Sequence, residues 1–426
     1  MRSGSVFARL VGVEQAVVES VEFDADDDAV VVSVRPRRAA AGRCGRCGRR
    51  CPRYDDGSGR RRWRALDLGL KRAYVEADAP RVSCPAHGVV VAAVPWARHN
   101  AGHTRGFDDL AAWLVRHTSK SAVQQVLRIA WRTVGTIVTR VLADADAAAG
   151  DRLAGVTRIG IDEISYKRGH RYLVVVVDHD TGRLLWAGEG RTKKTLAGFF
   201  DLLGEARCAQ ITLVSADGAD WIADLVGLRC PNAKICMDPF HVVKWAVDAL
   251  DQARRDLWRQ ARRNGQTALS LAFGRCRYAL WKNPEHLTDR QRAKLSWIQG
   301  ANKQLYRAYL IKEQLRQVFA TGGPERIAML DKWLSWAARC QIAPFVELAR
   351  RMRRYRDDIA NTLTHNLTNA RVEAVNTKIR LLTRIAFGFK SHQALTALVM
   401  LHSAATTSPS PADHDQPTHT CSRRAT

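Results

Sequence analysis

The chain has 426 residues and a formal net charge of +25, from 67 Lys and Arg against 42 Asp and Glu. This length suffices for two or three domains with sizeable cores, and the positive excess indicates a polyanionic partner, for which nucleic acid is the usual candidate. No apolar run approaches the roughly 20 residues of a membrane-spanning helix, and the N-terminus lacks a signal-peptide pattern. We therefore expect a cytoplasmic protein that has no membrane partner.

The first predicted module, residues 1–95, contains two short pairs of metal-binding residue types. Cys44 and Cys47 form a C-x-x-C, and Cys84 and His87 form a C-x-x-H further along the chain. Four such ligands on two tight turns suit a tetrahedral structural Zn²⁺, and the flanking residues alternate as strands do. Cys51 is an extra thiol that could replace one ligand, and a set of free thiols is the alternative interpretation.

Basic residues crowd the same module. The run 60–64 has the sequence Arg-Arg-Arg-Trp-Arg and could grip phosphates, with its tryptophan available for stacking or packing. A solvated basic face is the alternative. Because the local and the overall charge agree, we favour double-stranded DNA as the partner. The predicted contacts are Arg60, Arg61, Arg62 and Arg64.

Residues 104–145 have the spacing of a helix-turn-helix. Helical periodicity covers 107–117, 121–127 and 132–142, with Ser121 as a candidate N-cap and 128–131 as the turn. In such a motif the second helix of the pair enters the major groove with residues near its N-terminus, here Arg132 and Thr133. Any small three-helix bundle gives this pattern, but beside a basic zinc module we favour DNA binding.

After an acidic, alanine-rich linker at 143–151, the pattern predicts an α/β core over 152–244. Strands are expected at 158–162, 172–177, 184–188, 211–215 and 233–237, with helices at 195–203 and 219–226. The second and third strands form a hairpin. Three antiparallel strands, helix, strand, helix, strand is the order of the ribonuclease-H-like fold, a mixed five-stranded sheet with helices. In that fold the first and fourth strands are neighbours.

Three carboxylates could form a catalytic metal site in this core. Asp162 and Asp217 each end an apolar run, where an acid is costly unless it is paired or binds a cation. Glu373 flanks the apolar stripe of an amphipathic stretch at 371–382. Together they could hold two Mg²⁺ (or Mn²⁺) ions that keep positions open for phosphate. Neighbouring acids are rivals, Glu163 for Asp162 and Asp220 for Asp217, and a helix-surface Glu is the commonest interpretation of Glu373.

Further side chains could serve the same site. His241 closes a D-x-x-H sequence directly after the fifth strand, and it could face the scissile phosphate or order a loop. A structural role at the start of the next helix is an equally good interpretation. Asn376, Lys378 and Arg380 could line the DNA side of the glutamate helix.

The remaining segments are organised around this core. Residues 245–364 show helical periodicity without a strand pattern, so we predict an all-α insertion whose tryptophans lie in its own core. The core resumes at 365–402 with the glutamate helix. Residues 403–426 are rich in Pro, Ser and Thr, and we expect a disordered tail. The fold class is thus multidomain α/β, with a zinc-binding β module and a helix-turn-helix before the core.

These segments resemble the transposases of the bacterial ISL3 insertion-sequence family. The resemblance spans roughly residues 43–402, and its most specific parts surround Asp238 and Glu373. The residues that carry it are the two zinc pairs and the stretches 94–103, 117–134, 159–166, 214–220, 238–244 and 366–389. By this resemblance the family's Asp-Asp-Glu triad falls on Asp162, Asp217 and Glu373. His87 is a departure, since a cysteine is common there.

The resemblance implies a Mg²⁺-dependent DDE transposase. Such an enzyme binds the terminal inverted repeats of its insertion sequence, hydrolyses the DNA at the ends and joins the 3′-hydroxyls to target DNA. An oligomer is a mechanistic expectation, because two ends must be held together. Two alternatives remain open: a structure-specific nuclease of the same fold, and a non-catalytic repressor derived from a transposase.

Overall fold

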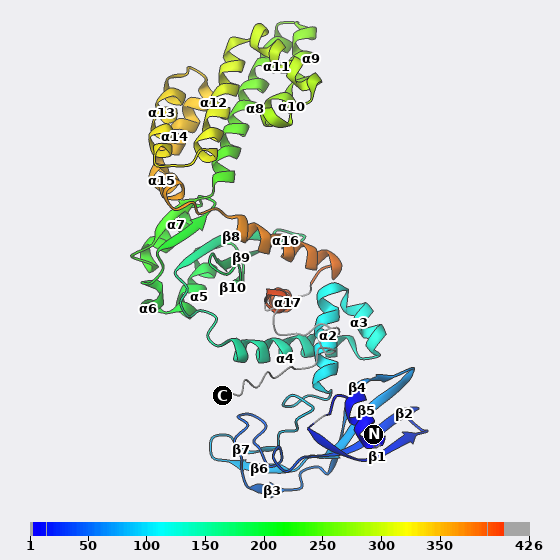
Figure 1. Cartoon of the computed structure of the whole chain (residues 1–426). Helices are drawn as coiled ribbons and strands as arrows, with labels where there is room; N and C mark the ends of the chain where they lie inside the picture. The colour runs from blue at the N-terminus through cyan, green and yellow to red at the C-terminus, as the bar shows by residue number, and fades with distance from the viewer. Residues whose placement is uncertain (1–2, 14, 390, 404–426) are drawn as a thin grey trace, which may run out of the picture. The chain divides into compact units, whose positions relative to one another are not determined.

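The computed structural model describes residues 3–13, 15–389 and 391–403. It divides into two compact units, one formed by the chain up to Arg152 together with the chain from Leu381 onward, and the other by Leu153–Arg380 (Figure 1). From residue 404 onward, the predicted tail lies outside the described residues. Within the described part of the chain, no helix has both the length and the apolar character needed to cross a bilayer.

Two small sheets and a short helix, α1 (Ser3–Leu10), begin the first unit. The larger sheet has the order β1-β2-β5-β4, with β2 and β5 parallel and the outer pairs antiparallel. The smaller sheet has the order β3-β6-β7. The strands are β1 (Ala16–Asp24), β2 (Ala29–Pro36), β3 (Arg53–Asp55), β4 (Arg60–Leu68), β5 (Lys71–Asp78), β6 (Arg81–Cys84) and β7 (Gly88–Val91). The rings of Trp63 and Trp96 meet edge-to-face in the larger sheet's core, 5.6 Å apart.

The predicted helix-turn-helix is present as α2 (Arg105–His117), α3 (Lys120–Leu127) and α4 (Trp131–Ala149). Two details of the prediction were wrong. The N-cap of α3 is Ser119, whose hydroxyl accepts from the Ala122 N–H, and not Ser121. The expected linker at 143–149 instead continues α4, because its alanines favour a helix and Ala145 is buried. In the same unit, α17 (His392–Ser403) packs against α4.

A five-stranded sheet forms the centre of the second unit, in the order β10-β9-β8-β11-β12. Its strands are β8 (Arg158–Lys167), β9 (Arg171–Asp178), β10 (Leu184–Glu189), β11 (Leu213–Ala216) and β12 (Lys234–Met237). The first three pair antiparallel, and β11 pairs parallel with both β8 and β12. The expected adjacency of the first and fourth strands is confirmed.

The expected end of the first strand was wrong. Strand β8 continues to Lys167, so Asp162 lies in its middle and not at its end. The reason is that residues 163–167 still pair with β9, with Ile164 and Tyr166 buried and Ser165 exposed.

Helices cover one face of this sheet. Because side chains alternate along a strand, Ile159 and Ile161 of β8 point to the same face, where they pack with Phe199 and Leu225. These last two come from α5 (Lys193–Leu203) and α7 (Asp220–Arg229), which contact each other; α6 (Glu205–Cys208) follows α5. The opposite face of β8 therefore carries Gly160 and Asp162.

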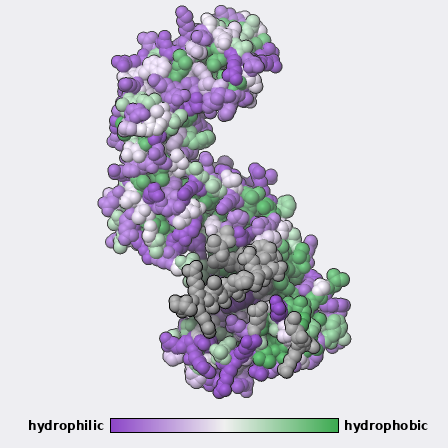
Figure 2. Space-filling view, in the orientation of Figure 1, coloured by the Kyte–Doolittle hydropathy of each residue, from purple (hydrophilic) through white to green (hydrophobic). Residues whose placement is uncertain are grey.

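Between residues 239 and 365, all of which are described, the secondary structure is helical throughout. The helices are α8 (Pro239–Arg263), α9 (Thr267–Arg275), α10 (Arg277–Trp281), the 3₁₀ turn Pro284–His286, α11 (Asp289–Ala301), α12 (Lys303–Ala320), α13 (Glu325–Arg339), α14 (Ala343–Arg354) and α15 (Arg356–His365). Trp333 is fully buried, and Trp245, Trp258, Trp281 and Trp336 pack partly buried on this core. Trp297 is 39% exposed. The visible outer face of these helices is mainly hydrophilic (Figure 2).

Helix α15 returns the chain to the sheet. Its Asn361 side chain donates to the carbonyl of Ile235 at 3.0 Å, and the Thr362 hydroxyl donates to the carbonyl of Met237 at 2.7 Å. Both carbonyls belong to β12, the strand from which α8 departs. The next helix, α16 (Ala370–Ile385), then lies over the open face of β8.

Gly160 permits the close approach of α16 to β8. A Cβ at this position would lie 2.3 Å from Cγ2 of Val372, 2.8 Å from Nε2 of His179 and 3.1 Å from Oγ of Ser215. All three side chains are buried, and they have little room to move. A glycine is therefore required by the distance between helix and strand.

We expect Gly160→Ala to destabilise the protein by about 1–3 kcal/mol, the usual cost of overpacking a filled core. Gly227→Ala is the matched control, because Gly227 lies in α7 and a Cβ added there would meet no neighbouring side chain within 4 Å. Alanine should be neutral or favourable at that position. Thermal unfolding followed by tryptophan fluorescence measures both, and equal stability of Gly160→Ala and wild type would contradict the packing argument.

Candidate zinc and carboxylate sites

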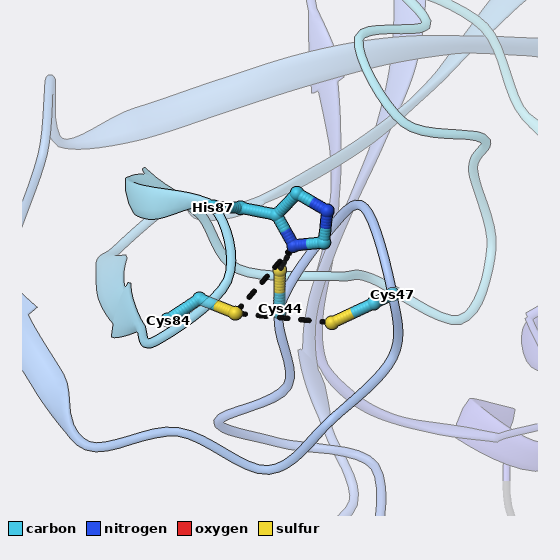
Figure 3. A group of neighbouring side chains, drawn as sticks. All are labelled: Cys44, Cys47, Cys84 and His87. Carbon is cyan, nitrogen blue, oxygen red and sulfur yellow. Dashed lines mark hydrogen bonds between the residues drawn. The ribbon is translucent and has the colours of Figure 1, made fainter.

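The two predicted pairs of zinc ligands meet in the first unit. The ligand atoms of Cys44, Cys47, Cys84 and His87 all lie within 4.8 Å of one another. His87 Nδ1 lies 3.7 Å from Cys44 Sγ and 3.5 Å from Cys84 Sγ, and the sulfurs of Cys47 and Cys84 are 3.8 Å apart (Figure 3). Three thiols and one imidazole at these separations suit a tetrahedral structural Zn²⁺.

Local structure positions these ligands and favours the metal-binding thiolate form. Cys84 ends β6 and His87 lies in the turn before β7, so the second pair is held by a hairpin. Burial raises the pKa of the Cys84 thiol, but hydrogen bonds from the Ala86 backbone and from Cys44 outweigh it and bring the pKa down to about 7. The thiolate is the form that binds metal. Cys51 lies outside this group; it is buried and its thiol donates to the Arg49 carbonyl at 3.3 Å.

In the second unit, two hydrogen bonds fix the Asp162 carboxylate. Its Oδ1 accepts from the Glu163 backbone N–H and its Oδ2 accepts from the Asn376 amide, each at 2.7 Å. Burial raises the pKa of Asp162, and the negative charge of Asp217 raises it further. The two aspartates predicted from the sequence therefore influence each other electrostatically.

Asp217 follows β11 at a tight turn. Gly218, the next residue, has a φ of +85°, and a Cβ there would lie 2.7 Å from the sulfur of Met237, so glycine is needed for the turn. Asp217 is half-buried, and its Oδ1 has no hydrogen-bond partner among the described residues. A buried acceptor oxygen without a donor is the kind of group that binds a cation.

His241 lies beside the same carboxylates. It is on the first turn of α8, and its Nδ1 is 3.0 Å from Oδ2 of the buried Asp238. This hydrogen bond raises the pKa of His241, burial lowers it, and the charges of Asp217 and Asp162 raise it again, with a net upward shift. The D-x-x-H sequence thus places an imidazole with a raised pKa beside the acidic site.

A buried chain of polar groups lies behind the site, and no sequence motif predicts it. His179 Nε2 lies 2.6 Å from Oγ of Ser215, and that hydroxyl donates to Oδ1 of Asn369. The Asn369 backbone N–H in turn reaches Oδ1 of Asp238 at 3.4 Å. Burial lowers the pKa of His179 to about 4, which keeps it neutral. The available signal was Ser215, a hydroxyl that interrupts an otherwise apolar strand.

The third predicted acid, Glu373, is exposed on α16. Its side chain makes no hydrogen bond or ion pair with any described residue, and the three predicted carboxylates do not form a group within 4.8 Å. Glu373 lies one turn before Asn376, which does reach Asp162. Lys378 and Arg380 are exposed on the same helix.

The rival acids have partners of their own. Glu163 forms an ion pair with Arg191, and its side chain is only 11% exposed. Asp220 accepts a hydrogen bond from the Tyr355 hydroxyl at 2.6 Å. Burial raises the pKa of Glu163, and the charges of Asp217 and Asp162 raise it further, so Glu163 belongs to the same acidic cluster.

The arginines of β4 make many internal contacts. Arg64 is buried and pairs with Asp67, which leaves no surface for a phosphate. Arg62 pairs with three carboxylates, those of Asp24, Asp27 and Glu76. Arg60 also pairs with Glu76, and Arg61 lies over Trp63 and donates to the Ala101 carbonyl. On α4, Arg132 is exposed and Thr133 is half-buried, both in the first turn.

Comparison with known protein families gives three matches, in chain order. Residues 40–87 match the zinc finger of the transposases of IS204, IS1001, IS1096 and IS1165. Residues 92–142 match the helix-turn-helix domain of the ISL3 transposase family, and residues 159–399 match that family's transposase domain. The four metal ligands lie in the first range, α2, α3 and the first part of α4 lie in the second, and the sheet from Ile159 onward lies in the third with α16.

Whole-chain relatives agree with the domain matches. The transposase for insertion sequence element IS1557 of Mycobacterium tuberculosis, in strains CDC 1551 and H37Rv, is 54% identical over 441 aligned positions, covering 98% of this chain and 99% of the relative. The transposase for IS1001 of Bordetella parapertussis is 25% identical over 379, covering 88% and 92%.

We expect Cys47→Ser to abolish zinc binding, from about one ion per chain, because a serine hydroxyl is a poor replacement for a thiolate at such a site. The exposed position of Cys47 makes the serine itself well tolerated. Metal analysis of the purified chain measures the effect. Cys51→Ala is the control and should keep its zinc. Loss of zinc from Cys51→Ala, with retention in Cys47→Ser, would show that Cys51 and not Cys47 is the ligand.

The Asp238–His241 pair predicts a pH-dependent contribution to stability. The pKa of His241 is raised by folding, so the contribution is complete below the unfolded value of about 6.5 and is lost as pH rises through the folded value. His241→Gln should cost about 0.5–1 kcal/mol at pH 5.5, since the imidazole is 35% exposed. Urea unfolding at pH 5.5 and pH 9 tests this. A pH-independent difference, or one that persists in an Asp238→Asn background, would exclude this pair as its source.

Proposed function

Because the chain belongs to the ISL3 family of insertion-sequence transposases, we propose that it is a DDE transposase that cuts DNA at the ends of its element and joins them to target DNA. The first step is hydrolysis of a phosphodiester bond at the element's end. The second is attack by the freed 3′-hydroxyl on target DNA. In this scheme the second unit carries out the chemistry, and the zinc and helix-turn-helix modules recognise the ends.

One observation supports the catalytic part above all others. Asp162 on β8 and Asp217 after β11 belong to adjacent central strands of a sheet with the order β10-β9-β8-β11-β12. This order, with its antiparallel and parallel pairs, is that of the ribonuclease-H-like fold, and we assign the core to that class. Helix α16 then reaches Asp162 from the far end of a helical insertion that we place at 245–364.

The residues of this site fit divalent cations with oxygen ligands. Mg²⁺ or Mn²⁺ prefers carboxylate oxygens, and the buried Oδ1 of Asp217 has no partner among the described residues. Asp162, Asp217 and Glu373 would hold two ions. Ions bound there would supply charge to activate the attacking oxygen and to stabilise the leaving oxygen of an in-line displacement at phosphorus.

The side chains around the acids orient the groups of the site. The Glu163 N–H and the Asn376 amide orient the Asp162 carboxylate, and Asp238 holds His241 with its ring beside the two aspartates. A protonated His241 can donate to a phosphate oxygen of the scissile group. Glu373 is exposed one turn from Asn376, its side chain has no partner among the described residues, and we assign it as the acid that completes the site with DNA.

DNA recognition falls to the other modules. We propose that α4 enters the major groove of the terminal inverted repeats, with Arg132 and Thr133 at its start. Arg60 and Arg61, with the zinc module at 1–95, would add phosphate contacts, as would Lys378 and Arg380 beside the catalytic site. The DNA substrate places the enzyme in the cytoplasm, and the need to hold two ends together favours a homo-oligomer in the DNA complex.

An excision assay tests the proposal. A donor plasmid carries the gene's own flanking DNA around a marker, and wild type is compared with Asp162→Asn and Asp217→Asn at matched protein levels. We expect each variant to lower excision by roughly a hundredfold or more, because charge stabilisation at the reacting phosphate is lost. Binding to end DNA should be unchanged.

Asp224→Asn is the matched control, since Asp224 is an aspartate of α7 whose charge is paired with Lys193 away from the site. It should excise normally. End binding without excision by any protein would favour a repressor, and cutting of branched DNA without joining of ends would favour a nuclease. Full excision by Asp217→Asn would remove that residue from the catalytic site.

A further inference from the structure

Asn376 lies where α16 passes closest to β8. Val372 of the helix packs on Gly160 of the strand, and Asn376, four residues later, meets Asp162, two residues further along β8. Four helical residues advance about 6 Å and two strand residues about 6.6 Å. The helix and the strand therefore stay in register, and the position of Asn376 opposite Asp162 follows from the backbone packing at Gly160.

Only one of the two polar atoms of the Asn376 carboxamide has a hydrogen-bond partner among the described residues. The side chain is 2% exposed, and its Nδ2 donates to Oδ2 of Asp162 at 2.7 Å. Its Oδ1 is buried and has no hydrogen-bond partner among the described residues. Buried acceptors of this kind are rare in native proteins, and each requires a physical explanation such as an ion or a functional role.

A second oxygen of the same kind belongs to the same site. Oδ1 of Asp217 is also buried and unpaired in the described chain, and the charge of Asp217 acts on Asp162. The two acceptors thus belong to residues next to Asp162: Asn376 donates to its carboxylate, and Asp217 follows β11, the strand that pairs with β8. Both are hard oxygens of the type that Mg²⁺ and Mn²⁺ bind.

An amide suits the site as an additional ligand, because Asp162 and Asp217 already bring two negative charges to a partly buried setting. An amide oxygen supplies a ligand without charge. In this structure α16 presents Asn376 to Asp162, while Glu373 remains exposed.

We propose that Asn376 is a fourth member of the metal site: its amide N–H group fixes Asp162, and its Oδ1 binds the divalent cation that Asp162 and Asp217 hold. This inference rests on the proposed function, because it presumes a cation at the two aspartates. It adds a ligand that lies outside the Asp-Asp-Glu set, at a residue for which the sequence suggested only a place on the DNA side of the helix.

Binding of Mn²⁺ to the full-length protein, measured by titration calorimetry without DNA, tests the proposal independently of activity. Asn376→Ala removes both the donor and the ligand oxygen, and we expect Mn²⁺ affinity to fall about tenfold or more. Asn376→Asp keeps an oxygen at the position, and we expect its affinity at pH 8 to stay within about threefold of wild type. Thr377→Ala, at the exposed neighbouring position, is the control and should bind as wild type does.

Zinc content and the thermal unfolding temperature verify that each variant folds. Wild-type Mn²⁺ affinity in Asn376→Ala, or an equal loss in Asn376→Ala and Asn376→Asp, would overturn the ligand role of Asn376. Asp162→Asn and Asp217→Asn are measured in parallel. If those two lose Mn²⁺ and Asn376→Ala does not, only this inference fails. If wild type binds no Mn²⁺, or the aspartate variants bind as wild type does, the proposed metal site fails with it.

Discussion

The contact of α16 with β8 is the interaction on which the candidate catalytic site depends. Gly160 lets Val372 approach the strand, and this approach places Asn376 against Asp162 across a sequence separation of 214 residues. The same contact aligns the start of α16 with the buried chain formed by Ser215 and Asn369. Without this packing, the acids of the sheet and the residues of the helix would belong to separate surfaces.

Much of the architecture could be predicted because it depends on local periodicity. Alternating and continuous apolar runs locate the five strands, and helical spacing locates α2, α3 and α4. The errors arose where a neighbouring pattern was missed. Strand β8 continues past Asp162 because Ile164 and Tyr166 are buried on it, and α4 continues through the alanines that suggested a linker. In both cases the element was correct and its end was wrong.

The same distinction between local pattern and tertiary packing applies to the candidate sites. The zinc ligands were predictable because their two pairs are short motifs, whereas the partners of Asp162 are set by tertiary packing. No local pattern distinguishes Asn376 from Glu373 as the residue that reaches the strand. Similarly, Arg64 belongs to a basic run, but its ion pair with Asp67 keeps it inside. A basic run in a sequence predicts a phosphate-binding surface only when its side chains do not form ion pairs with acids of the same protein.

The helical segment between β12 and α16 begins and ends at one strand. Helix α8 leaves directly after Met237, and α15 returns to the carbonyls of Ile235 and Met237. An excursion whose two ends share an anchor can lengthen or shorten with little change to the geometry at its base, because the entropy of closing a loop grows only with the logarithm of its length. This segment can therefore change in length or packing over evolution while the arrangement of Asp162, Asp217 and α16 at the sheet stays the same.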